Sequence, residues 1–337
     1  MQEIGGSAHR CTNTKVASTH TLRLPKLKAM KLHKLLLVVA LHAVAADTYD
    51  DIVARCAKTV EEAGITPDEC STPGPPGLRP GQLAGRLVVI TGASRGVGAE
   101  LARRFASEGA MVVVNYYKSK DKAEAVVAEI NRHLPQALAV YGDVRVKADM
   151  DALVAKAEAH FGAKVSVLVN NALQSYRFDP TSASASLRTV EWESIDAQMR
   201  GTVQGAVNAV QAVLPSFEAQ KYGKVINVGT NLVYNPVVTY YDYSAAKAAL
   251  VSLTRNLAAE LGPLGVRVNL VAGGLLERTD ASSLTTDEVF GYVAGATPLR
   301  KTTTVEDFAK ACVFFAAEAS DAVTGQSLSV DGGLTMP

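Results

Sequence analysis

Apolar runs rich in β-branched residues recur from residue 83 to the C-terminus, and stretches with helical spacing separate them. Continuous apolar strands that alternate with helices are typical of a parallel sheet covered on both faces. The pattern predicts one α/β, doubly wound domain over residues 83–337. Its seven strands are predicted at Leu87–Thr91, Met111–Tyr116, Ala137–Tyr141, Val165–Asn170, Lys224–Val228, Val266–Val271 and Ser327–Val330. Helices are predicted at Ala99–Glu108, Asp121–Leu134, Asp149–Phe161, Val190–Leu214 and Tyr243–Leu261.

The first 82 residues lack this alternation and predict a poorly structured extension. Residues 1–46 are basic and end in the apolar run Leu35–Ala46. Three interpretations stay open: a secretory signal peptide that starts at Met30, a mitochondrial transit peptide, or a segment with no role. Residues 47–82 comprise an acidic stretch and a Pro/Gly-rich linker, Ser71–Gln82. We expect a cytoplasmic protein if the extension is not used, and a secretory or mitochondrial one otherwise.

Composition and charge exclude several classes of protein. Apolar residues make up 48% of the chain and charged residues 20%, as in a globular protein with a full core. The 34 basic and 33 acidic side chains nearly cancel, so neither nucleic acid nor an anionic membrane is a favoured partner. The run Leu35–Ala46 is too short to span a bilayer, so stable membrane insertion is not expected.

Histidine and cysteine positions narrow the chemistry further. All six histidines lie in the first half of the chain, which excludes a hydrolase whose histidine follows a serine nucleophile late in the sequence. The four cysteines show no C-x-x-C pair, so no metal site is predicted. Cys56 and Cys70 could pair in an exported protein. Acid–base chemistry in the second half must therefore use Tyr, Lys or carboxylates.

A glycine-rich turn, Thr91–Gly98 (TGASRGVG), lies where the first strand ends and the first helix begins. Gly92 permits a tight turn, while Gly96 and Gly98 let backbone and helix approach a pyrophosphate closely. The N-terminus of the helix offers free N–H groups to the anion. The turn predicts a Rossmann-type dinucleotide site, with cofactor contacts from Gly92, Ser94, Arg95, Gly96, Val97 and Gly98.

The end of the second strand indicates which dinucleotide binds. A carboxylate there would bind the ribose 2′-hydroxyl of NAD. The chain instead reads Asn115-Tyr116-Tyr117-Lys118, with no acid before Asp121. Because Arg95 and Lys118 are cations that suit a 2′-phosphate, we expect NADP(H). Asn115, Tyr116 and Lys118 are the predicted contacts.

Tyr243 and Lys247 stand four residues apart in Y-S-A-A-K, about 150 residues after the glycine turn. Residues i and i+4 share one face of a helix, so both side chains can reach the same small volume. A neighbouring cation favours the ionised phenol, and we therefore expect the pKa of Tyr243 to lie below its usual value of about 10. The pair predicts proton exchange with a substrate.

From Gln82 onward the chain resembles the short-chain dehydrogenase/reductase family, and specifically its 3-oxoacyl-[acyl-carrier-protein] reductase-like members. The resemblance rests on six motifs that occur in order: Thr91–Gly98, Asp143-Val144, Asn170-Asn171-Ala172, Tyr243 with Lys247, Arg267–Asn269 (RVN) and Val330–Gly333 (VDGG).

The resemblance implies specific roles. Asp143 and Val144 would contact the adenine, Asn171 would line the cofactor cleft, and Leu276 would lie beside the nicotinamide. Tyr243 would exchange the substrate proton. Lys247 would bind the nicotinamide ribose and lower the pKa of the tyrosine. The resemblance also implies a homotetramer or homodimer.

Three positions depart from the family pattern. Thr230 stands where the family usually has a serine that binds the reacting oxygen, and it keeps the hydroxyl. Gln198 aligns with an asparagine that helps relay protons through water. Leu173 replaces the glycine of N-N-A-G, and Gly273-Gly274 replaces P-G. Tyr240 and Tyr241, which have no lysine four places on, are expected to be wall or surface residues.

The expected activity is NADPH-dependent reduction of a ketone to a secondary alcohol, with Tyr243 as proton donor and Thr230 binding the oxygen. The resemblance suggests a 3-oxoacyl thioester as the substrate. The alternatives are a dehydrogenase of a small lipid-like or aromatic secondary alcohol, and a nucleotide-binding member without catalysis. The segment Leu275–Thr297, long for a connection, is expected to form the loop that covers the substrate.

Overall fold

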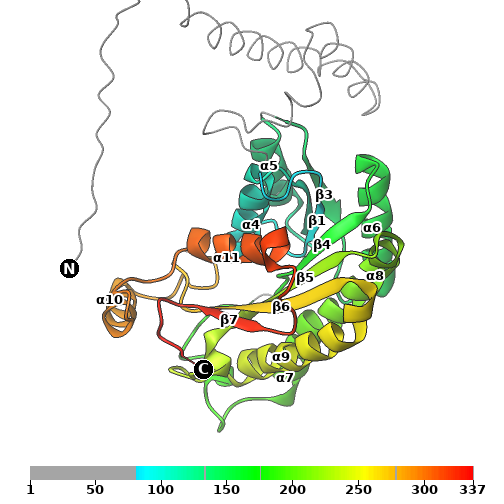
Figure 1. The fold of residues 1–337 in the computed structure, drawn as a ribbon. Coiled ribbons are helices and arrows are strands. Elements are labelled where there is room, and N and C mark those ends of the chain that lie inside the picture. Colours follow the sequence, from blue (N-terminus) through cyan, green and yellow to red (C-terminus); the bar gives the residue numbers. More distant parts are fainter. Residues whose placement is uncertain (1–80, 133, 175, 278, 337) are drawn as a thin grey trace, which may run out of the picture. The chain divides into compact units, whose positions relative to one another are not determined.

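The computed structural model describes residues 81–132, 134–174, 176–277 and 279–336. Within these ranges lies a single sheet of seven strands (Figure 1). The strands are β1 (Leu87–Ile90), β2 (Met111–Tyr116), β3 (Ala137–Tyr141), β4 (Val165–Asn170), β5 (Gly223–Thr230), β6 (Val266–Gly273) and β7 (Ser327–Val330). The predictions for residues 1–80, including the targeting-like segment and the pairing of Cys56 with Cys70, lie outside the described residues.

All neighbouring strands are parallel, and their order is β3-β2-β1-β4-β5-β6-β7. The predicted α/β doubly wound sheet is therefore confirmed. The apolar runs predict its strands because strands buried on both faces carry few polar residues; all six residues of β4, for example, are buried. Asn269 in β6 donates to Val323 O and accepts from Gln326 N–H, which fixes the segment that enters β7.

Helices cover both faces of the sheet (Figure 1). On one face α4 (Gly96–Ser107), α5 (Lys120–Ile130) and α11 (Val305–Ala316) pack around Phe105 and Phe308. On the other face α6 (Lys147–Phe161), α8 (Gly205–Gln220) and α9 (Tyr241–Leu261) pack around Met150 and Phe217. The two layers bury the sheet between them.

The single helix predicted over Val190–Leu214 is wrong in detail. The chain forms α7 (Trp192–Met199), a π-helical turn at Arg200–Gln204, and then α8. A Cβ on Gly201 would lie 2.8 Å from Gln174 Cβ, and one on Gly205 would lie 2.8 Å from Val144 Cγ2. The widened turn thus lies where the helix packs closely against the segments that follow β3 and β4. π-turns of this kind are frequent at functional sites.

The segment predicted as a long loop contains the helix α10 (Asp287–Ala296). Its N-cap is Thr286, whose side chain accepts a hydrogen bond from Val289 N–H. None of its residues is buried. Because a helix is predicted from an apolar stripe that faces a core, the sequence pattern did not reveal this one. None of the helices in the described ranges is both long enough and apolar enough to cross a membrane.

Candidate active site

The site lies at the carboxyl ends of the strands, where the strand order reverses between β1 and β4. The chain leaves β1 toward α4 on one face of the sheet and leaves β4 toward α7 and α8 on the other. In doubly wound sheets this divergence opens a crevice that binds ligands. A cavity of about 670 Å³ occupies the crevice, and segments that follow all six strands from β1 to β6 line it.

The glycine turn has the geometry of a dinucleotide cradle. Gly92 and Gly96 have φ values of +62° and +55°, which favour glycine. A Cβ on Gly98 would lie 2.5 Å from both Gly92 O and Asn171 Nδ2. The Asn171 amide in turn donates to Thr91 O and Gly92 O, at 2.9 and 3.1 Å. Only glycines permit the backbone to approach the N-terminus of the helix this closely. The free N–H groups of that N-terminus can then bind an anion, so the residues present fit a pyrophosphate.

The predicted catalytic pair, Tyr243 and Lys247, lines the same cavity. Tyr243 is in the first turn of α9 and Lys247 one turn later, and both side chains line the cavity although they are only 7% and 3% exposed. Lys247 Nζ donates to Val228 O at 2.6 Å and lies 5.8 Å from the centre of the Tyr243 ring. Thr230, the last residue of β5, lines the same region and is 5% exposed.

Known proteins are similar to this chain in sequence and in fold. The model of the family described as enoyl-(acyl carrier protein) reductase matches residues 92–335. A curated relative, 3-oxoacyl-[acyl-carrier-protein] reductase FabG of Staphylococcus epidermidis, is 33% identical over 254 residues, which are 74% of this chain and 99% of that protein.

Two solved structures are similar in fold and sequence. A gluconate 5-dehydrogenase from Burkholderia cenocepacia, in complex with NADP and tartrate, has a TM-score of 0.67 and 32% identity, over 75% of this chain and 96% of its own. A 3-ketoacyl-(acyl-carrier-protein) reductase from Brucella melitensis, complexed with NADH, has a TM-score of 0.67 and 32% identity, over 75% and 99%. This chain belongs to the short-chain dehydrogenase/reductase family.

Membership agrees with the gathering of the predicted residues at one cavity. With the exception of Gln198, every residue predicted for catalysis or cofactor binding lines it: Gly92, Ser94, Arg95, Gly96, Val97, Gly98, Asn115, Tyr116, Lys118, Asp143, Val144, Asn171, Thr230, Tyr243, Lys247 and Leu276. Their individual roles stay predictions.

Two of the predicted cofactor residues are already engaged by the protein. Asn115 is 2% exposed; its Oδ1 accepts from Gly92 N–H at 3.0 Å and its amide donates to Gly142 O at 3.0 Å. The Asp143 carboxylate accepts from the Arg145 guanidinium at 2.6 Å, and this hydrogen bond lowers the pKa of Asp143. Asn115 therefore holds the glycine turn in place. The sequence did not single out Arg145, which also lies over the Tyr117 ring.

The structure brings a distant carboxylate to Arg95, one of the two cations predicted to bind the 2′-phosphate. Arg95 forms an ion pair with Asp280 at 3.3 Å, and Lys122 lies 3.9 Å from the same oxygen. Asp280 belongs to the segment after β6, about 185 positions from Arg95 along the chain. No local pattern in the sequence could have revealed this contact.

The expected low pKa of Tyr243 is not found. Burial raises the pKa of Tyr243 to about 12, and only the hydrogen bond with Thr230 opposes this rise. Burial also lowers the pKa of Lys247 to about 8. The Lys247 ammonium points to the Val228 carbonyl, so desolvation outweighs its attraction for a phenolate.

Gln198, the fourth residue predicted to be catalytic, is buried and does not line the cavity. It is 5% exposed and its amide donates to Gln174 O at 3.3 Å.

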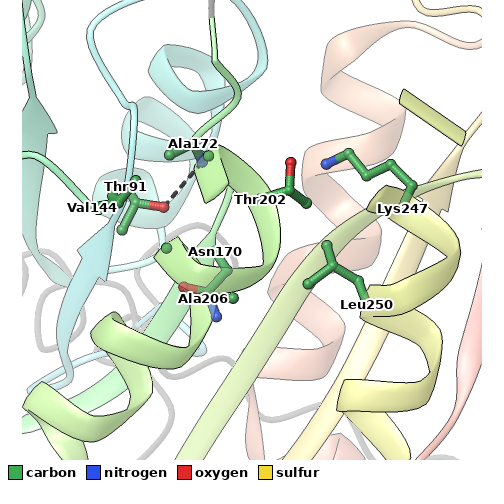
Figure 2. Close-up of a pocket in the computed structure, with 10 residues that line it drawn as sticks. Thr91, Val144, Asn170, Ala172, Thr202, Ala206, Lys247 and Leu250 are labelled. Atoms are coloured by element: carbon green, nitrogen blue, oxygen red, sulfur yellow. Dashed lines mark hydrogen bonds between the residues drawn. The ribbon is translucent and has the colours of Figure 1, made fainter. Parts of the chain in front are cut away.

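A separate small pocket of about 10 Å³ lies beside Lys247, and Thr202 and Asn170 are among the residues that line it. Thr202 Oγ1 and Asn170 Oδ1 have no hydrogen-bond partner among the described residues. Figure 2 shows Thr202 and Lys247 among the residues that line this pocket. The pocket has the volume of about one water molecule, with polar groups to bind it.

Proposed function

We propose that this protein reduces a ketone to a secondary alcohol with NADPH, and that a 3-oxoacyl thioester is the substrate. The observation that carries the proposal is the shared cavity: the Tyr243 side chain, the Thr230 side chain and the glycine cradle all face it. The similarity to proteins named 3-oxoacyl and 3-ketoacyl reductases favours the thioester, and it suggests a place in fatty acid metabolism.

The residues of this chain account for the proton and the oxygen. A bound reduced nicotinamide supplies the hydride that the carbonyl carbon must receive. Tyr243 gives its proton to the carbonyl oxygen, and Thr230 stabilises the charge that develops there by donating a hydrogen bond. With a pKa of about 12, Tyr243 holds its proton at neutral pH, which is the state that reduction requires. Lys247 supplies positive charge close to the phenolate that remains.

The preference for NADPH rests on charge. Arg95, in the glycine turn after β1, and Lys118, after β2, line the cavity, and the end of β2 itself carries no carboxylate. Two cations with no acid at that strand end suit a 2′-phosphate better than a free 2′-hydroxyl, and Asp280, which pairs with Arg95, comes from the segment after β6. The solved relatives hold NADP in one case and NADH in the other, so the choice depends on these residues.

A screen of ketones with both cofactors tests the proposal. The absorbance of the reduced nicotinamide would be followed with acetoacetyl thioesters, other ketones and, as a comparison, an enoyl thioester. We expect NADPH oxidation with 3-oxoacyl thioesters. Tyr243→Phe should abolish turnover and leave the dissociation constant for NADPH within about twofold. Binding of NADPH without turnover of any ketone would support the non-catalytic alternative instead.

Two further properties follow by similarity to the family. We propose a homodimer or homotetramer, which sedimentation analysis would detect as a mass of two or four chains. The compartment depends on residues 1–80 and can be determined by sequencing the N-terminus of the mature protein. A mature start at Asp47 would support export, and a start near Gln82 would leave the reductase domain alone.

A further inference from the structure

Two aromatic rings contact the ring of Tyr243, and a third contacts those two. The Tyr176 ring stacks on the Tyr243 ring, with centres 5.0 Å apart and an interplanar angle of 22°. Phe178 meets it edge-on at 5.2 Å and 89°. Tyr240 completes the group, 5.5 Å from Phe178 and 6.1 Å from Tyr176. We call Tyr176, Phe178 and Tyr240 the aromatic wall; all three line the cavity.

Hydrogen bonds hold this wall in place. The Tyr176 hydroxyl donates to Asp242 Oδ1 at 3.2 Å, and the same oxygen accepts from Tyr243 N–H at 2.7 Å. Asp242 is only 4% exposed, so this connection is buried. Phe178 N–H donates to Ala281 O at 3.0 Å, which ties the segment after β4 to the segment after β6. The rings are therefore preorganised, which reduces the entropy lost when a ligand packs against them.

The part of the cavity around the wall carries little charge. Of the lining residues that follow β4, β5 and β6, only Lys247 and Asp280 are charged, and Asp280 is paired with Arg95. The other lining cations, Arg95, Lys118 and Arg145, follow β1, β2 and β3. Most of the uncharged residues that line the cavity from these segments and from the C-terminal segment are apolar, among them Leu173, Leu232, Val237, Val238, Leu275, Val289, Val293 and Leu334. A charged substituent next to the reacting carbonyl would find no partner here except the catalytic lysine.

We propose that the aromatic wall selects ketones whose carbonyl carbon carries a flat, uncharged ring. The inference rests on the proposed ketone reduction and narrows its substrate class to aryl 3-oxoacyl compounds and similar ring ketones. Aromatic rings attract one another in stacked and edge-on arrangements with centres about 4.5–7 Å apart. Each such contact changes a specificity constant by about two- to tenfold. A ring on the carbonyl carbon would come close to Tyr176 and Phe178 when Tyr243 reaches the carbonyl oxygen, because both side chains contact the Tyr243 ring and line the cavity.

Two 3-oxo esters and a set of variants test this inference. Ethyl benzoylacetate and ethyl 3-oxohexanoate stand in for the thioesters and carry a phenyl and a propyl group on the reacting carbonyl. The readout is the ratio of their kcat/KM values with NADPH. We expect Phe178→Leu and Tyr176→Leu each to lower the ratio about fivefold relative to the unsubstituted protein. The intrinsic reactivity of the two ketones cancels in this comparison.

Two control variants separate ring recognition from general damage. Phe178→Tyr keeps a ring and should retain the ratio. Phe314→Leu changes an aromatic residue of α11 that is 40% exposed and outside the lining of the cavity, so it should also retain the ratio. If neither Phe178→Leu nor Tyr176→Leu lowers the ratio, the inference is wrong while ketone reduction stands. If the unsubstituted protein reduces no ketone with either cofactor, the proposed function is wrong and the inference with it.

Discussion

At the scale of single residues, burial determines the charge states of the catalytic pair. Tyr243 and Lys247 are both buried, and desolvation disfavours the charged form of each. The pKa of the phenol therefore rises while that of the ammonium falls. At neutral pH the phenol therefore keeps its proton, and the ammonium loses its proton more easily than an exposed lysine does.

Lys247 should leave a measurable trace in the pH dependence of stability. Its pKa falls from 10.5 to about 8 on folding, so between these values the unfolded chain binds more protons and stability rises with pH. In the absence of cofactor, we expect Lys247→Met to have a higher free energy of unfolding than the unsubstituted protein at pH 7. By about pH 9.5 the difference between the two proteins should shrink by about 2 kcal/mol, because the unsubstituted protein gains stability. Urea unfolding of both proteins at the two pH values measures this. A stability difference that does not change with pH would contradict it.

At the scale of elements, the junction of β1 and α4 depends on glycines that touch the backbone. Gly98→Ala would place a methyl group 2.5 Å from Gly92 O, so the turn must shift. We expect a loss of about 1–3 kcal/mol of unfolding free energy and roughly tenfold or more weaker NADPH binding, measured by denaturation and by fluorescence titration.

Gly291→Ala is the matched control for this substitution. Gly291 lies within α10, and an added Cβ there would meet no atom within 4 Å. The same chemical change should therefore stabilise that helix by about 0.5–1 kcal/mol. NADPH binding should stay the same. Equal effects of the two alanines would show that crowding at Gly98 is not the cause.

The segment after β6 should influence the choice of cofactor through Asp280. Its carboxylate pairs with Arg95, the cation expected to bind the 2′-phosphate, and so competes with that phosphate. We expect Asp280→Asn to tighten NADPH binding about three- to tenfold at low salt and to leave NADH binding unchanged. Asp287→Asn, on α10, is the control. Weaker NADPH binding by Asp280→Asn would show that Asp280 supports the site instead.

At the scale of the whole molecule, the buried clusters of the described chain begin at Leu83 and extend to α11 and β7. A chain that starts at Pro80 contains all of them and the complete sheet. We expect it to unfold cooperatively, with a midpoint within about 3 °C of the full chain and the same affinity for NADPH. A calorimetric scan of both proteins tests this.

A chain that starts at Val88 is the control for this truncation. It lacks Leu83 and Leu87, which are both fully buried, and should lose several degrees of thermal stability or fail to fold. If the chain that starts at Pro80 behaved in the same way, residues 1–79 would be part of the stable fold.

The sequence by itself determined the architecture and most of the candidate site. Strand runs, the glycine turn and the spacing of Tyr243 and Lys247 are local patterns, and parallel topology brings strand ends to one edge of the sheet. For this reason the predicted strands agree with the observed ones to within a few residues, and all the predicted site residues except Gln198 line one cavity. The π-turn was not predicted because packing between segments, rather than periodicity, determines it. The helix α10 was not predicted because it buries no residue.

Only the tertiary structure decided which groups face one another. The contacts of Asp280 with Arg95, of Thr202 with the Lys247 pocket, and of Tyr176 with Tyr243 join segments 45 or more positions apart. No periodic pattern encodes such contacts, since they exist only after the helices have packed on the sheet. The raised pKa of Tyr243 has the same origin, because desolvation depends on every segment that encloses the side chain.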